Sequence, residues 1–357
     1  MAHWPAGQDN WSISWICSTC DRYIRSTTSD KVSYVCHTSV IEPPTKAGLE
    51  AALCWDTSDL VPRHPAMTEF RQRTRLHQAR WRESEGHPIG SQPYAPRPGV
   101  DPRPVGSRIP LAYGRDSGAN FVTTPALEAV KARTAIVERE QSIDHQRLWA
   151  DLLSSEALTF NLFGNLAADP SRADRLVHAW FADAPGRVEE VRFLHSPGRL
   201  ESQWLNSLRQ FDAAFVLLQH DGSHGLVAVD VTYHERLKAE TPKPENLWRN
   251  REVHERSAAF RPEAFERVKG RSDLWSPWLE HLLLLSMLQH PGGAWTWGRY
   301  VTVHAADNVE MAERSVRYAG LLADATTFWS TSLEEVLGLG VLPSPAVRAL
   351  RDRYLQR

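Results

Sequence analysis

Two runs of apolar and β-branched residues give the clearest pattern in the chain. They span residues 211–219 and 226–233, and the glycine-containing segment 221–225 joins them. Runs of this length on both sides of a short turn predict an antiparallel β-hairpin. Residues 188–194 predict a strand before the hairpin, and residues 300–304 predict one after it.

Helical patterns surround these strands. Helix starts are predicted at Thr124-Pro125, Asp144, Asp169-Pro170, Asp307 (with Glu310), Ser332 (with Glu335) and Ser344-Pro345. The apolar stretch 275–290, which Pro291-Gly292-Gly293 ends, predicts a buried helix. Between residues 145 and 304 the order is therefore helix, three strands, helix, strand. This order suits an α/β fold in which helices cover both faces of a mixed sheet.

The domain organisation follows from changes in composition. Residues 1–62 hold all four cysteines and little helical periodicity, so they predict a leader or a small separate module. A helical stretch begins at Arg63, and residues 63–357 form the predicted main domain. Residues 87–115 are rich in proline and glycine, which predicts a connection that wraps the domain.

Composition narrows the function classes. Of the 357 residues, 42% are hydrophobic and 24% charged, as in globular proteins and unlike disordered tails. The formal net charge of −2 means that a nucleic-acid partner would bind through a local basic patch. We expect no membrane span, because no apolar run is long enough. Four cysteines and no signal-peptide pattern favour a reducing cytoplasm.

Two acids stand at the open end of the predicted hairpin. Asp212 is near the start of the first strand and Asp230 near the end of the second, both among apolar neighbours. Antiparallel pairing would bring them together, and two buried carboxylates raise each other's pKa. A Mg²⁺ ion would relieve this cost, with the Val231 backbone carbonyl as a further ligand. The alternative is structural: Asp212 caps the strand end and Asp230 pairs with an arginine.

Several segments around these acids resemble one family. They are residues 154–164, 195–199, 211–218, 227–235 and the helix around Glu280-His281-Leu282-Leu283. Together they resemble bacterial PD-(D/E)XK nuclease-like proteins, over roughly Thr68 to Leu337. The resemblance implies a restriction-endonuclease-like core of order αβββαβ, here with an N-terminal extension. It also implies Mg²⁺-dependent hydrolysis of nucleic acid, DNA in the first instance.

The resemblance assigns roles to individual residues. Asp212 and Asp230 match the two metal-binding acids. Glu156, on the helix before the sheet, matches the acidic or amide position that many of these nucleases place near the site. Glu235 matches an acid just beyond the second strand.

The chain departs from the family pattern at one position. The family has lysine two residues after the second acid, and here that residue is Thr232. Threonine donates a hydrogen bond but carries no charge. Lys238 or Lys243 could reach the site from the following segment, or catalysis could be weakened or lost. A non-catalytic nuclease fold that binds nucleic acid or protein therefore remains an alternative function.

Two further groups invite a function. Zinc could be held by Cys17, Cys20 and Cys36 with Cys54 or His37, although only the first pair has knuckle spacing. Incidental cysteines are the simpler interpretation. Residues 71–82 include five arginines that could follow phosphates, but acidic residues on both sides favour an ordinary helix surface.

Overall fold

The computed structural model describes residues 43–54, 68–93, 99–141, 143–235, 237, 239–240, 246–270 and 272–356. It also describes the backbone of two short antiparallel strands, β1 (Trp15–Ile16) and β2 (Tyr23–Ile24). Contacts divide the chain into a unit of residues 1–43 with Arg357 and a unit of residues 44–356. Residues 44–54 thus lie in the larger unit. Their Leu53 carbonyl accepts a hydrogen bond of 3.0 Å from the Gly106 amide.

The larger unit alternates helices and strands. Before the central sheet come α1 (Lys46–Ala51), α2 (Glu69–Ser84), β3 (Gly90–Ser91), β4 (Pro104–Val105), α3 (Leu111–Ser117), α4 (Thr124–Thr134), α5 (His145–Ala150), α6 (Ser155–Ala167) and α7 (Pro170–Trp180). The sheet and its crossover comprise β5 (Arg187–His195), β6 (Phe211–Leu218), β7 (His224–Thr232), α8 (Leu247–Ser257), α9 (Ala264–Val268), α10 (Trp275–Leu288) and β8 (Trp295–His304). The chain continues through α11 (Val309–Ala319), the 3-10 helix η2 (Ala325–Thr327), β9 (Phe328–Ser332), α12 (Leu333–Gly338) and α13 (Ser344–Tyr354).

Strands β5 to β9 form one mixed sheet in that order. The first three pair antiparallel, and the β6–β7 hairpin is the one that the sequence predicted. Strand β8 then pairs parallel to β7, and β9 pairs parallel to β8. A parallel neighbour requires a crossover, and here the crossover carries α8, α9 and α10. The predicted order αβββαβ is confirmed.

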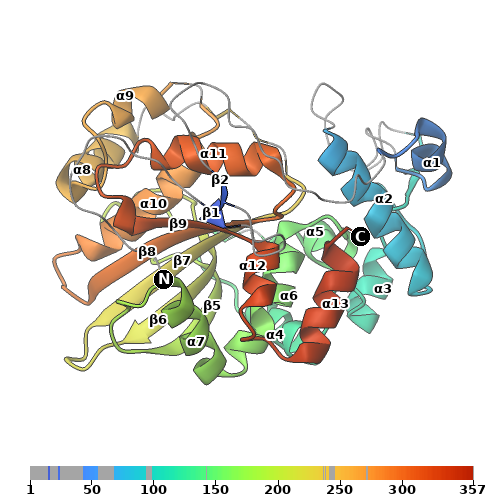
Figure 1. The fold of residues 1–357 in the computed structure, drawn as a ribbon, viewed down its shortest axis with the longest axis horizontal. Helices are drawn as coiled ribbons and strands as arrows, with labels where there is room; N and C mark the ends of the chain where they lie inside the picture. Colours follow the sequence, from blue (N-terminus) through green and yellow to red (C-terminus); the bar gives the residue numbers. More distant parts are fainter. Residues whose placement is uncertain are drawn as a thin grey trace. The chain divides into compact units, whose positions relative to one another are not determined.

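Helices cover both faces of this sheet, as predicted (Figure 1). On one face, α4, α6, α7, α12 and α13 bury their apolar side chains against the alternate strand residues that include Phe215 and Val229. On the other face, α8, α9, α10 and α11 pack over the residues that include Ala214, Ala228 and Tyr300. The two faces therefore have separate cores, and α10 and α11 cover the face that carries the candidate site.

Several helix ends differ from their predictions. The sequence pattern predicted one helix from Asp144 through Leu148, Leu152 and Ala157. Asp144 caps α5 as expected, but this helix stops at Ala150, and Ser154 caps a separate helix, α6. The Ser332–Glu335 capping box at α12 is confirmed. The predicted box at Asp307 is wrong, because Asn308 is the N-cap of α11 and makes no capping hydrogen bond through its side chain.

The proline-rich segment 87–115 contains more regular structure than its composition indicated. Strands β3 and β4 pair antiparallel within it, and α3 begins at Leu111. The buried Arg108 fixes this segment to α5 and its end, through the Gln146 carbonyl at 3.2 Å and an ion pair with Asp151 at 3.3 Å. Within the described segments, every helix is too short or too polar to span a lipid bilayer.

Candidate metal centre

Asp212 and Asp230 face each other across the open end of the hairpin. The β6–β7 ladder pairs Ala213 with Val229, so the next position outward sets Asp212 opposite Asp230. Strand alternation puts Asp230 on the same face as Ala228, which belongs to the core beneath α10. The structure thus brings the two predicted acids together on one face.

Asp212 is held by the neighbouring strand. The Val231 amide donates a hydrogen bond of 2.8 Å to Asp212 Oδ2. Burial raises the pKa of Asp212 well above its ordinary value, and the charge of Asp230 raises it further. The Val231 hydrogen bond opposes this shift without cancelling it. The carboxylate form of Asp212 therefore lacks sufficient compensation from the protein.

Asp230 forms a long ion pair with an arginine. An Nη2 atom of Arg314, on α11, lies 3.9 Å from Asp230 Oδ2, which is an ion pair but too long for a hydrogen bond. Burial raises the pKa of Asp230, and Arg314 only partly opposes this. The structural alternative, in which Asp230 pairs with an arginine, is thus partly realised. It leaves the acid pair short of positive charge.

A third carboxylate, Glu280 on α10, lies near enough to Asp230 and Asp212 for their charges to interact. Its Oε2 accepts a hydrogen bond of 2.8 Å from the Tyr300 hydroxyl, and its Oε1 accepts from Ser276 at 3.1 Å and lies 3.4 Å from Arg209 Nη1. Burial and the charge of Asp230 raise the pKa of Glu280 to about 8. We call Asp212, Asp230 and Glu280 the acid cluster.

Sequence reasoning gave Glu280 no role in the site, although a signal was present. The residue is an acid within an otherwise apolar stretch of a buried helix, Trp278-Leu279-Glu280-His281-Leu282. Buried carboxylates are rare unless they are paired or bind a ligand. The segment was used only for its resemblance to the family.

Glu156 lies in the first turn of α6. It is near enough to the acid cluster for its charge to raise the pKa of Asp212. Burial raises the pKa of Glu156 to about 7, although Arg147 opposes the shift. Among the described residues, Glu156 Oε2 is a buried atom that has no hydrogen-bond partner. An unpartnered carboxylate oxygen in this position is available to a cation or a bound water.

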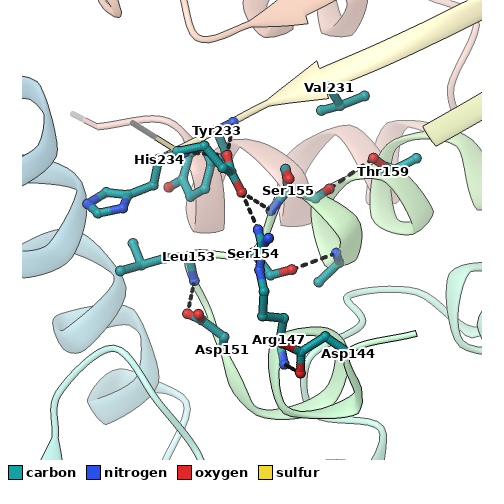
Figure 2. A network of polar contacts seen from close by, with 12 residues as sticks. Asp144, Arg147, Asp151, Leu153, Ser154, Ser155, Thr159, Val231, Tyr233 and His234 are labelled. Carbon is teal, nitrogen blue, oxygen red and sulfur yellow. Dashed lines mark hydrogen bonds and ion pairs between the residues drawn. The ribbon is translucent and has the colours of Figure 1, made fainter. Parts of the chain in front are cut away.

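Glu235 differs from the other acids because donors surround its carboxylate. Oε1 accepts from Arg147 Nη2 at 2.6 Å and from the Ser155 amide at 3.0 Å, and Oε2 accepts from the amides of Tyr233 at 2.9 Å and His234 at 3.1 Å. Figure 2 shows Arg147 and Ser155 converging beside Tyr233 and His234. Although burial alone would raise the pKa of Glu235, Arg147 and these hydrogen bonds lower it. We call Glu235, Arg147 and Ser155 the anchor cluster, because it ties the end of β7 to the start of α6.

Thr232, at the position where the family has lysine, is the last residue of strand β7. Thr232 is buried and pairs with His304 of the parallel strand β8. Lys238 and Lys243, the two lysines that could replace the missing charge, lie outside the described residues. The described cations near the acid cluster are Arg209 and Arg314, and neither was predicted from the sequence.

The acid pair fits a Mg²⁺ ion better than it fits a metal that requires many protein ligands. In the described part of the chain, no three Asp, Glu, His or Cys side chains are grouped so that they could hold a metal ion. Mg²⁺ commonly binds through one or two carboxylates and keeps several waters. Asp212 and Asp230, two opposed and undercompensated carboxylates, have the chemistry for that kind of site.

The other predicted groups do not contribute to the candidate site or are not among the described residues. Cys17, Cys20, Cys36 and His37 are not among the described residues, and Cys54 is buried, with its Sγ 3.6 Å from the Ala52 carbonyl. Arginines of the basic stretch on α2 form hydrogen bonds within the chain. For example, Arg71 donates to the carbonyls of His234 and Glu235, and Arg82 donates to the Gly106 carbonyl. These contacts fit the interpretation of α2 as an ordinary helix rather than a phosphate track.

Comparison with known proteins adds a family to this geometry. The sequence model of a family described as PD-(D/E)XK nuclease superfamily matches residues 65–356. Neither the curated proteins nor the solved structures that were searched gave a match. The matched region contains the whole five-stranded sheet, both helical layers and every residue of the acid and anchor clusters. The chain therefore belongs to the PD-(D/E)XK nuclease superfamily.

Proposed function

We propose that this chain is a metal-dependent nuclease that hydrolyses phosphodiester bonds in nucleic acid, with residues 63–357 as the nuclease domain. The observation that carries the proposal is the close approach of Asp212 and Asp230, one position beyond the last β6–β7 pair, where each affects the pKa of the other. Both acids are half-buried on one face of the sheet, and desolvation raises the pKa of each. In a member of a nuclease superfamily, a site with more carboxylates than cations supports a function in metal binding.

In this proposal Asp212 and Asp230 hold Mg²⁺, assisted by the Val231 carbonyl. A bound Mg²⁺ supplies positive charge to the phosphate and makes an attacking water more acidic. Glu156, with its unpartnered Oε2, orients that water or accepts its proton. Glu235 acts indirectly, because its hydrogen bonds fix the start of α6 and so the position of Glu156.

The overall reaction is a balanced hydrolysis. The water oxygen forms a bond to phosphorus and one P–O ester bond breaks. One water proton ends on the departing oxygen, which becomes a hydroxyl, and the other is released from the new phosphate monoester at neutral pH. No redox partner is needed.

A second function is a nuclease fold that binds nucleic acid or protein without cleaving. Thr232 in the lysine position favours it, because threonine offers no charge to the transition state. The ion pair between Arg314 and Asp230 also favours it, since an arginine beside the acid pair weakens cation binding.

Incubation with nucleic acid separates the two functions. Supercoiled plasmid, linear duplex and single-stranded RNA are each incubated with the full-length protein and Mg²⁺, then with EDTA. We expect cleavage that needs Mg²⁺ and that falls by about 1,000-fold or more in Asp230→Ala. The matched control is Asp221→Ala in the exposed β6–β7 turn, where Asp221 accepts hydrogen bonds from Ser223, and it should cleave like the wild type.

Each outcome decides between the functions. Cleavage that persists in Asp230→Ala would reject the proposed site. No cleavage of any substrate with Mg²⁺ or Mn²⁺, together with retained binding, would favour the non-catalytic function. The preferred substrate identifies DNA or RNA as the target.

A further inference from the structure

We propose that Arg314 contacts the phosphate of the bound nucleic acid and supplies the positive charge that the family's lysine supplies in other members. This inference rests on the proposed function, because it names a residue of the same site. The positive charge then comes from α11, which follows β8, the last strand of the αβββαβ core. The family's lysine instead lies two residues after the second acid.

The position of Arg314 carries the first step. Its guanidinium lies beside Asp230, with 3.9 Å between Nη2 and Oδ2, and the side chain is only 12% exposed. Within the described residues this loose ion pair is its only ion pair, and the guanidinium makes no hydrogen bond. Arginine has five N–H donors, so most of them are available to an oxyanion that enters beside Asp230.

The other arginines near the acids are already committed. Arg209 Nη1 bonds to the Ser276 hydroxyl at 2.6 Å, and Arg209 Nη2 lies 2.5 Å from Glu240. Arg147 Nη2 binds Glu235 at 2.6 Å. Of the described arginines around the acid cluster, Arg314 is thus the one that can turn towards a ligand without breaking a hydrogen bond.

Helix α11 is held firmly enough to aim this side chain. At its start, Asn308 Nδ2 donates to the Tyr233 carbonyl at 3.4 Å, and Glu310 pairs with the buried Arg71 at 3.1 Å. One residue after Arg314, the Ser315 hydroxyl lies 3.5 Å from that of Thr302. Thr302 is the β8 partner of Asp230, so α11 and the second acid share one fixed frame.

The chemistry suits arginine in one respect and limits it in another. A guanidinium makes bidentate hydrogen bonds to a phosphate and stabilises the charge that develops during attack. It stays protonated in proteins, so it cannot accept the proton of the water. Arg314 therefore replaces the charge of the lysine and leaves proton transfer to another group, for which Glu156 is the candidate.

Three variants test the proposal in the full-length protein. Arg314→Met removes the charge and keeps most of the length, Arg314→Lys restores the charge, and Arg317→Met is the matched control. Arg317 lies on the same helix and pairs with Asp273 at 2.5 Å, away from the acid cluster. Each variant is measured for cleavage rate with Mg²⁺, for binding to a short DNA duplex with Ca²⁺, and for melting temperature.

We expect Arg314→Met to cleave about 100-fold more slowly and to bind DNA about 10-fold more weakly. Arg314→Lys should recover at least about 10-fold of the lost rate, and Arg317→Met should match the wild type. If Arg314 only neutralises Asp230, Arg314→Met will lose melting temperature while it keeps its DNA affinity, which overturns the proposal. An equal loss in the Met and Lys variants also overturns it.

The binding assay keeps this test separate from that of the proposed function. If the wild-type protein binds DNA without cleaving it, the proposed nuclease function is contradicted. Weaker DNA binding by Arg314→Met would still support the phosphate contact. If the wild-type protein cleaves DNA and Arg314→Met equals it in cleavage rate and DNA affinity, only the proposed Arg314–phosphate contact is contradicted.

Discussion

Glu235 and Asp212 are both half-buried carboxylates beside strand β7, yet their surroundings shift their pKa in opposite directions. Glu235, in the anchor cluster, has four donors within 3.1 Å, and these lower its pKa. Asp212, in the acid cluster, has one backbone donor and faces a second aspartate, so its pKa is raised.

The difference separates a structural acid from a candidate ligand. The protein itself supplies the positive charge and the N–H groups that Glu235 needs, so this carboxylate has no need of a metal. The acid cluster holds three carboxylates against two arginines, one of them at 3.9 Å. Burial alone therefore does not identify a metal ligand; the shortage of donors does.

Glu235→Ala should have the largest effect on stability. It removes the partner of Arg147 and leaves four donors unsatisfied, so we expect a loss of about 3 kcal/mol in the free energy of unfolding. Urea denaturation measures this loss. Glu189→Ala, at an exposed position on β5, is the control and should change stability by about 0.5 kcal/mol or less. Equal effects of the two substitutions would contradict the anchor role.

Asp212→Asn should act in the opposite direction, with a smaller effect. Asparagine keeps an oxygen for the Val231 amide and removes the buried charge, so the metal-free protein should gain about 2 kcal/mol. The folded-state pKa of Asp212 is raised, so the wild type loses stability as pH rises and the gain should grow with pH. Denaturation in EDTA at several pH values measures it. A less stable variant would break the comparison.

The same variant should lose its response to metal. Mg²⁺ that binds the folded wild type raises its melting temperature by mass action. Asp212→Asn lacks one ligand, so its melting temperature should stay the same with and without Mg²⁺. A full thermal shift in the variant would mean that the ion binds elsewhere.

Glu156→Gln should have the smallest effect, and pH should reveal it. Burial raises the pKa of Glu156 from 4.5 to about 7, so the folded protein holds a proton that the unfolded chain releases. The wild type should therefore lose stability between about pH 4.5 and 7, and the glutamine variant should lose roughly 1 to 2 kcal/mol less. Parallel unfolding curves at pH 4.5 and 8 measure the difference. Identical pH dependence in both proteins would contradict the shift.

Local patterns were enough to predict the core of the fold. The hairpin, the buried helix α10 and the αβββαβ order follow from apolar runs, turn residues and caps that lie close together in the sequence. Strand β9 was missed because its five residues, Phe-Trp-Ser-Thr-Ser, alternate weakly and precede a strong helix cap at Ser332. Its pairing with β8 depends on tertiary contacts that no local pattern carries.

From the sequence, only the site residues on the β6–β7 hairpin could be predicted to lie together. Asp212 and Asp230 meet through the register of one turn, which the sequence defines. Glu280 and Arg314 reach the same point on two later helices, and their positions depend on how α10 and α11 pack on the sheet. A charged residue on a helix gives no local sign of which strand end it will face.

The parallel pairing of β7 with β8 has a consequence for the order in which the site forms. The β6–β7 hairpin closes over a short turn, whereas β8 can join only after the chain through α8, α9 and α10 has been laid across the sheet. As the ribosome makes the chain, the two aspartates can therefore meet before Arg314 exists. A nascent protein at that stage would lack the ion pair between Arg314 and Asp230, so a cation from solution could bind the two aspartates first.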